Sequence, residues 1–207
     1  LEKKGFLLVD SGATYMDGTT DITRTYPLGE LTEDEKRFYT WTLQSHIDLA
    51  RAVWLDYCEC KMIDTIAREP LWRHLINYRC GTGHSVSFVG NVHEGPHALN
   101  SRNTTRMRPG MVVTDEPGVY ETDLVGIRIE NELVCIHKTD NQYGTFLGFE
   151  PLTFVPIATS PILPGVLDKD ELAWLNDYHR QVFAKLAPHL NAEERVWLAE
   201  KCASIGC

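Results

Sequence analysis

The segment Gly126–Glu132 constrains the fold more than any other stretch of this chain, because it alternates between apolar and charged side chains. In an extended strand, Ile127 and Ile129 would face one side, and the charged residues between and after them would face the other. A charged strand face normally lies in solvent. Burying Arg128 beside Glu130 would make sense if both side chains served a charged cluster. The segment therefore predicts a β-strand with one apolar face and a candidate site on the other.

Four carboxylates and one imidazole can contribute to such a site. Besides Glu130, the candidates are Glu116, Asp10, Asp21 and His84. Together they form a mostly oxygen ligand set, which suits hard to borderline divalent cations. Two such cations held side by side can activate a water molecule and bind a substrate oxygen. The sequence therefore predicts a metal site that holds a pair of divalent ions.

Composition narrows the classes of partner. With 207 residues, of which 43% are apolar, the chain can build one domain with a substantial core. A net charge of −9 argues against nucleic acid or a membrane surface as the main partner. The sequence shows neither an apolar run long enough to span a membrane nor the pattern of a signal peptide. Its six cysteines include no CxxC pair. Reduced thiols and a cytoplasmic location are therefore expected.

Two regions of the chain are predicted to form strands. Residues 5–27 are typical of a hairpin, because an apolar run is followed by a turn and then by a run rich in Thr and β-branched residues. Residues 80–135 are dense in Gly, Val and Ile, which indicates loops and strands. Together with the helices expected elsewhere, these regions predict one α+β domain.

Helices are expected between and after the strands. Residues 31–55 are predicted to form a helix that Thr32 caps, with Glu35 completing a capping box. Residues 62–67 are predicted to form a second helix, broken at Pro70 and resumed beyond it. The same capping pattern predicts the starts of two C-terminal helices, at Asp168 with Glu171 and at Asn191 with Glu194.

The register of the hairpin decides whether its two aspartates can share a site. A hairpin centred just before Asp17 would place Asp10 opposite Thr23. Asp21 would then be a diagonal neighbour of Asp10 on the same face, about 7–8 Å away, which is near enough to share a metal pair. A turn centred one residue later would instead place Asp10 opposite Thr25 and separate the carboxylates. The metal hypothesis therefore requires the first register.

Several segments, in this order along the chain, resemble the catalytic domain of X-prolyl aminopeptidases (aminopeptidase P) of the eukaryotic cytosolic type, which are metallopeptidases of family M24. The similar segments are Val9–Ala13, Asp17–Thr25, Gly81–His84, Asn91–Pro96, Thr114–Gly118, Gly126–Asn131, Phe149–Thr153 and Trp174–His179. The resemblance implies the pita-bread fold, a curved antiparallel sheet backed by helices. It further implies a catalytic domain at residues 1–160 and a C-terminal helical extension at residues 161–207 packed on it.

The resemblance also implies a role for each candidate residue. The implied metal ligands are Asp10, Asp21, His84, Glu116 and Glu130, which would hold two divalent ions, commonly Mn²⁺, with Zn²⁺ or Co²⁺ as alternatives. His93 would contact the substrate oxygen, Glu116 would shuttle a proton, and Arg128 would orient the carboxylates. A metal-bridging hydroxide would attack the scissile carbonyl and release the N-terminal residue from peptides with proline in second position. A homodimer is also expected.

The chain departs from the family pattern at a few places. Cys80 stands where the family usually has a histidine of the substrate pocket, and residues 85–88 replace a run of small, Gly-rich residues. The chain also begins at Leu1 within a strand pattern, so we expect an N-terminally incomplete piece that lacks a further substrate-binding histidine. Because groups that bind the transition state would be lost, we expect the piece alone to be a poor enzyme.

The same residues are compatible with two other functions. A prolidase would hydrolyse X-Pro dipeptides through a similar metal centre. A non-catalytic pita-bread protein would keep the fold as a module that binds peptides or proteins. Members that only bind typically lose several of the five ligands, and this chain keeps all five. The sequences of the motifs and the C-terminal segment favour the aminopeptidase over the prolidase.

Overall fold

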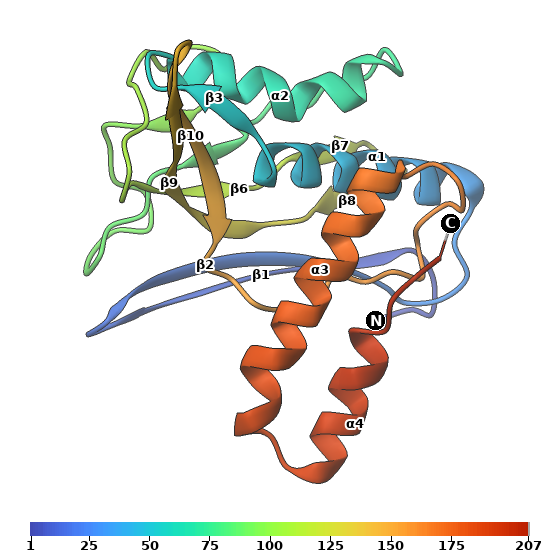
Figure 1. Cartoon of the computed structure of the whole chain (residues 1–207). Helices are drawn as coiled ribbons and strands as arrows, with labels where there is room; N and C mark the ends of the chain where they lie inside the picture. The colour runs from blue at the N-terminus through green and yellow to red at the C-terminus, as the bar shows by residue number, and fades with distance from the viewer. Residues whose placement is uncertain (207) are drawn as a thin grey trace.

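The computed structural model describes residues 1–206, and Cys207 lies outside the described part. The strands are β1 (Phe6–Tyr15), β2 (Gly18–Pro27), β3 (Val53–Leu55), β4 (Gly83–His84), β5 (Ala98–Leu99), β6 (Val112–Asp115), β7 (Gly118–Glu121), β8 (Val125–Arg128), β9 (Asn131–Asn141) and β10 (Gly144–Pro151). The helices are α1 (Glu33–Ala50), α2 (Cys60–Trp72), α3 (Lys169–Leu186) and α4 (Ala192–Lys201), with a 3-10 turn η1 at Ala187–His189. The strands pair in antiparallel fashion, so the α+β prediction is confirmed (Figure 1).

The ribbon of β1 and β2 has the register that the metal hypothesis requires. Asp10 pairs with Thr23, and Gly12 pairs with Asp21. Asp10 and Asp21 are therefore diagonal neighbours on one face, as predicted. Gly12 is needed for this close pairing, since a Cβ atom there would lie 2.5 Å from the carbonyl oxygen of Thr20.

A second sheet, in the order β3-β10-β9-β6, packs against α2 and the end of α1. The residues buried in this first core cluster include Leu49, Ile63, Ala67, Leu99, Val113, Leu133, Leu147 and Phe149. Because strands and helices both contribute, the cluster holds the sheet in a fixed place beneath the helices. Two candidate metal ligands adjoin this sheet. Glu116 directly follows β6, and Glu130 directly precedes β9.

A second core cluster joins α1 to β8 and to the C-terminal helices. It contains Tyr39, Leu43, Ile47, Ile127, Ile129, Leu175, Tyr178, Val182 and Leu198. Ile127 and Ile129 are 0% and 1% exposed, which confirms the apolar face predicted for this segment. The segment is not one continuous strand, because β8 ends at Arg128 and β9 begins at Asn131. In Figure 1, α3 and α4 lie side by side at the red end of the chain.

The capped starts of three helices were predicted correctly, whereas the end of the first helix was not, and the second helix begins at Cys60 rather than at residue 62. Capping boxes are present at all three predicted N-termini, at Thr32, Asp168 and Asn191. The first helix ends at Ala50 instead of continuing to residue 55, because Val53–Leu55 pairs with β10 as strand β3. No helix within residues 1–206 is long and apolar enough to cross a membrane.

The prediction that Pro70 breaks the second helix was wrong. Helix α2 runs without interruption through Pro70 to Trp72. A proline costs most in the middle of a helix, where its ring opposes the preceding turn and one hydrogen bond is missing. Pro70 lies in the last turn, so the helix ends soon after it. Leu75 lies beyond the helix and is 97% exposed, with a φ of 59°.

His179 on α3 should make the stability of the protein depend on pH. The imidazole is fully buried, and its Nε2 accepts a hydrogen bond of 3.1 Å from the N–H of Ile157. Burial, together with the charge of Arg24, lowers the pKa of His179 from 6.5 to about 4. The unfolded chain therefore takes up a proton at a higher pH than the folded chain. This contribution to stability is complete above pH ~6.5 and is lost as the pH falls toward about 4.

The measurement is urea unfolding of the wild type and of His179→Gln between pH 7 and pH 4.5. The variant keeps an acceptor for Ile157 but does not titrate, so its stability should fall less on acidification. The difference should reach the order of 2 kcal/mol. His189→Gln is the matched control, because His189 is exposed on η1. Identical pH slopes for the wild type and His179→Gln would contradict the assignment.

Candidate metal centre

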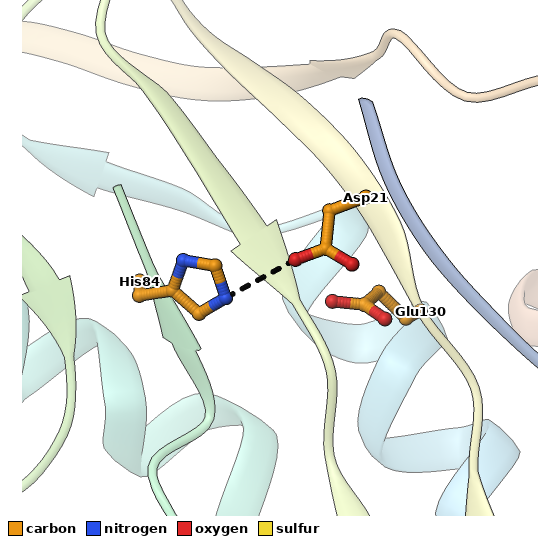
Figure 2. A group of neighbouring side chains, drawn as sticks. All are labelled: Asp21, His84 and Glu130. Carbon is orange, nitrogen blue, oxygen red and sulfur yellow. Dashed lines mark ion pairs between the residues drawn. The ribbon is translucent and has the colours of Figure 1, made fainter. Parts of the chain in front are cut away.

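Three of the predicted ligands converge from separate parts of the fold. Asp21 lies on β2, His84 on β4, and Glu130 in the short connection between β8 and β9. Each offers one ligand atom, and these atoms lie within 4.8 Å of one another. Figure 2 shows the three side chains pointing toward a common point. Glu116 joins the group, since its Oε1 and the Oδ2 of Asp21 both lie 3.3 Å from His84 Nε2.

Arg128 lies against the carboxylates and also connects Asp10 to them. Its Nε atom lies 3.8 Å from Glu116 Oε2 and 3.9 Å from Glu130 Oε2. Its guanidinium also pairs with Asp10 and donates a hydrogen bond of 2.7 Å to the hydroxyl of Tyr120. The Asp10 side chain is 52% exposed. The structure therefore places the fifth predicted ligand at the rim, on Arg128, rather than inside the group.

Two threonines that sequence reasoning did not single out fix the orientation of the glutamates. The Thr23 hydroxyl donates a hydrogen bond of 2.6 Å to Glu130 and accepts one of 2.9 Å from Arg128. The Thr114 hydroxyl donates to Glu116 at 3.1 Å and accepts from the backbone N–H of His84 at 2.9 Å. The available signal was positional, because Thr23 lies opposite Asp10 in the hairpin and Thr114 begins a motif.

A glycine lets the histidine loop approach the strand that leads to Glu116. A Cβ atom on Gly83 would lie 1.8 Å from the carbonyl oxygen of Thr114, so only glycine fits there. The N–H of Glu116 donates a hydrogen bond of 2.8 Å to the carbonyl oxygen of Thr82. Backbone contacts thus hold the loop of His84 and the segment of Glu116 together before any side chain is considered.

His93 stacks on His84 at the edge of the group. Their ring centroids are 3.6 Å apart and the planes are inclined by 26°. The loop of His93 is held by Ser85, whose hydroxyl donates to the carbonyl oxygen of Glu94 and whose own carbonyl oxygen accepts from the Glu94 N–H at 3.0 Å. Burial and the nearby charge of His84 lower the pKa of His93. His93 is also exposed, so its ring is accessible to a molecule that approaches the group of candidate ligands.

The electrostatics of the group suit a cation. The Glu130 side chain is 2% exposed, and burial together with the charge of Glu116 raises its pKa to about 8. Burial also raises the pKa of Glu116. Burial alone would lower the pKa of His84, but the hydrogen bond to Asp21 and the charge of Glu116 outweigh it and raise that pKa. Carboxylates crowded in this way repel one another, and divalent cations would relieve the repulsion. The residues present therefore fit a metal site.

A pocket of about 850 Å³ lies beside this group, between the β1–β2 ribbon and the sheet that carries β6 and β9. Its lining includes Thr20, Ser87, Phe88 and Glu132. The residues that replace the small, Gly-rich run of the family thus shape this pocket. Glu132 is 7% exposed, and burial raises its pKa to about 7.

The chain belongs to metallopeptidase family M24. Its residues 1–137 match "Metallopeptidase family M24", and residues 145–205 match the "C-terminal region of peptidase_M24". The chain is 44% identical over 204 residues to Aminopeptidase P2 of Arabidopsis thaliana, covering 96% of this chain and 29% of that protein. The resemblance recognised from the motifs is therefore confirmed.

Solved structures agree with this assignment. The X-prolyl aminopeptidase of Caenorhabditis elegans, described as a cytosolic enzyme with a di-nuclear active site, matches with a TM-score of 0.91 and 39% identity over 97% of this chain and 34% of that one. The prolidase of Pyrococcus furiosus matches with a TM-score of 0.62 and 31% identity over 73% of this chain and 42% of that one. The expected pita-bread fold is confirmed. The chain spans about a third of the length of the aminopeptidases it matches.

Proposed function

We propose that the protein is a metal-dependent X-prolyl aminopeptidase, which releases the N-terminal residue from peptides with proline in second position. One observation carries the proposal. The ligand atoms of Asp21, His84 and Glu130 lie within 4.8 Å of one another. They do so in a chain that is 39% identical to an X-prolyl aminopeptidase with a di-nuclear active site.

The cofactor in this proposal is a pair of divalent ions, with Mn²⁺ as the first candidate and Zn²⁺ or Co²⁺ as alternatives. The residues that would hold them are Asp10, Asp21, His84, Glu116 and Glu130. Bound there, the ions would supply Lewis acidity and a water molecule of lowered pKa. The donor set supports this part of the proposal, because carboxylate oxygens with one imidazole suit such ions.

The chain's own residues would manage the proton and the substrate. Glu116 would take the proton of the attacking water and pass it to the proline nitrogen as the C–N bond breaks. Its raised pKa favours this role, since a general acid–base works best near the operating pH. His93 would donate a hydrogen bond to the carbonyl oxygen as negative charge develops there. Arg128 would keep the carboxylates in orientation through its contacts with Glu116 and Glu130.

The organisation of the protein is part of the same proposal. Residues 1–160 would form the catalytic domain, and residues 161–207 a helical extension that packs on it. A homodimer in the cytoplasm is proposed from the resemblance, and the description of the C. elegans protein as a cytosolic enzyme supports the location.

Peptide assays of the full-length gene product test the proposal. The metal-free protein would be assayed with and without Mn²⁺ on three substrates: a tripeptide with proline second, the same tripeptide with alanine second, and an X-Pro dipeptide. We expect Mn²⁺-dependent release of the first residue from the proline tripeptide alone. Cleavage confined to the dipeptide would favour the prolidase. Tight Mn²⁺ binding without cleavage of any peptide would favour the binding module.

A further inference from the structure

A buried histidine on α1 lies directly behind the two segments that carry Glu116 and Glu130. His46 Nδ1 is 3.1 Å from Asp115 Oδ2 and 3.2 Å from the Asp115 carbonyl oxygen. On the other side of the ring, His46 Nε2 is 3.3 Å from Asn131 Nδ2. All three side chains belong to residues with 0% exposure. The imidazole thus bridges two strands from a third element.

The bridge is located where the backbone pairing of those strands ends. Asp115 and Asn131 form the last register pair of β6 with β9. Asp115 is followed at once by Glu116, and Asn131 is preceded at once by Glu130. The pairing resumes at Gly118 with Arg128, the first pair of β7 with β8, so the two glutamates lie in a short gap of the ladder. A side-chain bridge between Asp115 and Asn131 therefore holds one end of this gap.

The hydrogen bonds around His46 have one consistent arrangement. Arg24 donates to Asn131 Oδ1 at 2.7 Å, and the Tyr178 hydroxyl lies 3.3 Å from the same oxygen. The amide nitrogen of Asn131 is therefore the donor toward His46 Nε2, which leaves the imidazole proton on Nδ1, facing Asp115. Arg24 also donates to the carbonyl oxygen of Glu130 at 2.5 Å. The ring is thus held on one side by Asn131, which Arg24 holds in turn, and on the other by Asp115, whose backbone is paired in β6.

We infer that His46 is a positioning residue of the proposed metal centre, which fixes Glu116 and Glu130 relative to each other by bridging Asp115 and Asn131. The inference rests on the proposed function, because it takes the two glutamates as metal ligands. Hydrogen-bond partners behind metal ligands are known to control affinity in this way. The rival explanation is that His46 only fills the core. It packs edge-on against Trp174, with centroids 5.9 Å apart and planes at 80°, and another aromatic ring could do the same.

The variant His46→Phe separates these explanations. It keeps an aromatic ring against Trp174 and removes both polar contacts. We expect the dissociation constant for Mn²⁺, measured by calorimetry on the metal-free full-length gene product, to rise about 10–100-fold. Leu43→Ala is the matched control. Leu43 lies on the same helix and is fully buried in the second core cluster. Its loss should lower the unfolding temperature at least as much, yet leave the Mn²⁺ dissociation constant unchanged.

The outcomes can be told apart. A wild type that binds no Mn²⁺ would refute the proposed function itself, whereas a wild type that binds tightly leaves the inference to be judged on the variants. Unchanged affinity in His46→Phe, or an equal loss in Leu43→Ala, would overturn the inference. Should His46→Phe fail to fold, His46→Asn carries the test. It keeps a donor toward Asp115 but loses the acceptor for Asn131, so a weakened affinity supports the inference and an unchanged one overturns it.

Discussion

Glu130→Gln is expected to abolish tight binding of the metal pair and nearly all metal-dependent hydrolysis, whereas Glu132→Gln should leave both nearly intact. The two glutamates are both buried, at 1% and 7% exposure. They differ in what they contact. Glu130 lies with Asp21 and His84 in the group of ligand atoms, and Glu132 lines the neighbouring pocket. Loss of a charged ligand should cost more than the roughly 10–100-fold that supporting residues cost.

Calorimetric titration with Mn²⁺ measures the metal affinity of both variants and also the number of protons released on binding. Without metal, the pKa of Glu130 is raised to about 8 by burial and by Glu116, so the carboxyl is mostly protonated at pH 7. A cation must displace that proton, and the binding enthalpy should therefore depend on the ionisation enthalpy of the buffer. In the wild type, Glu130 should account for the release of about one proton when the metal pair binds. Equal loss of binding in Glu130→Gln and Glu132→Gln would refute the assignment.

The same raised pKa gives a pH dependence for the metal-free protein. A carboxyl that ionises near pH 8 when folded and near 4.5 when unfolded binds its proton more tightly in the folded state. The metal-free protein should therefore gain stability from Glu130 as the pH falls from about 8 toward 4.5. Because Gln does not titrate, urea unfolding of metal-free Glu130→Gln should show this gain missing.

The parts of the fold that depend on neighbouring residues could be predicted from the sequence. The hairpin itself follows from a turn and its flanking strands, but two registers stayed open, and only the metal hypothesis favoured the one that pairs Asp10 with Thr23. The capping box at Thr32 needs only Glu35, three residues away. The end of α1 could not be found in this way. Val53–Leu55 becomes a strand because it pairs with β10, and that partner lies far along the chain.

The candidate site shows the same division. The motifs predicted which residues would hold a metal, and the structure brings Asp21, His84 and Glu130 together. Of the groups that support them, Arg128 was recognised through the resemblance, but His46 was not. His46 occupies a position on an amphipathic helix where a core histidine would look the same. Its contacts with Asp115 and Asn131 join segments that are separated by long stretches of sequence, so no local pattern records them.

Arg24→Met should cost about 3–5 kcal/mol of unfolding free energy, because it removes a buried charge from a set of groups that are buried with it. Arg24 is 3% exposed. Its guanidinium donates to the carbonyl oxygens of Glu130 at 2.5 Å, Val155 at 2.8 Å and Pro156 at 3.2 Å. It also donates to the hydroxyl of Tyr178 at 3.0 Å. Without the guanidinium, the carbonyl groups of Glu130 and Pro156 would lose this donor, and the Val155 carbonyl would keep only the Tyr178 hydroxyl, at 2.9 Å.

Urea unfolding of the metal-free protein measures this cost against two other variants. Arg24→Lys keeps the charge, but one ammonium cannot reach oxygens on several sides, so most of the loss should remain. Arg37→Met removes an exposed arginine that pairs with Asp34 at 2.8 Å, and it should cost about 0.5 kcal/mol or less. An Arg24→Met variant as stable as Arg37→Met would show that the guanidinium is dispensable. Because the chain at Val155 and Pro156 loses its contacts with Arg24 in Arg24→Met, limited proteolysis should cut before α3 sooner in this variant than in the wild type.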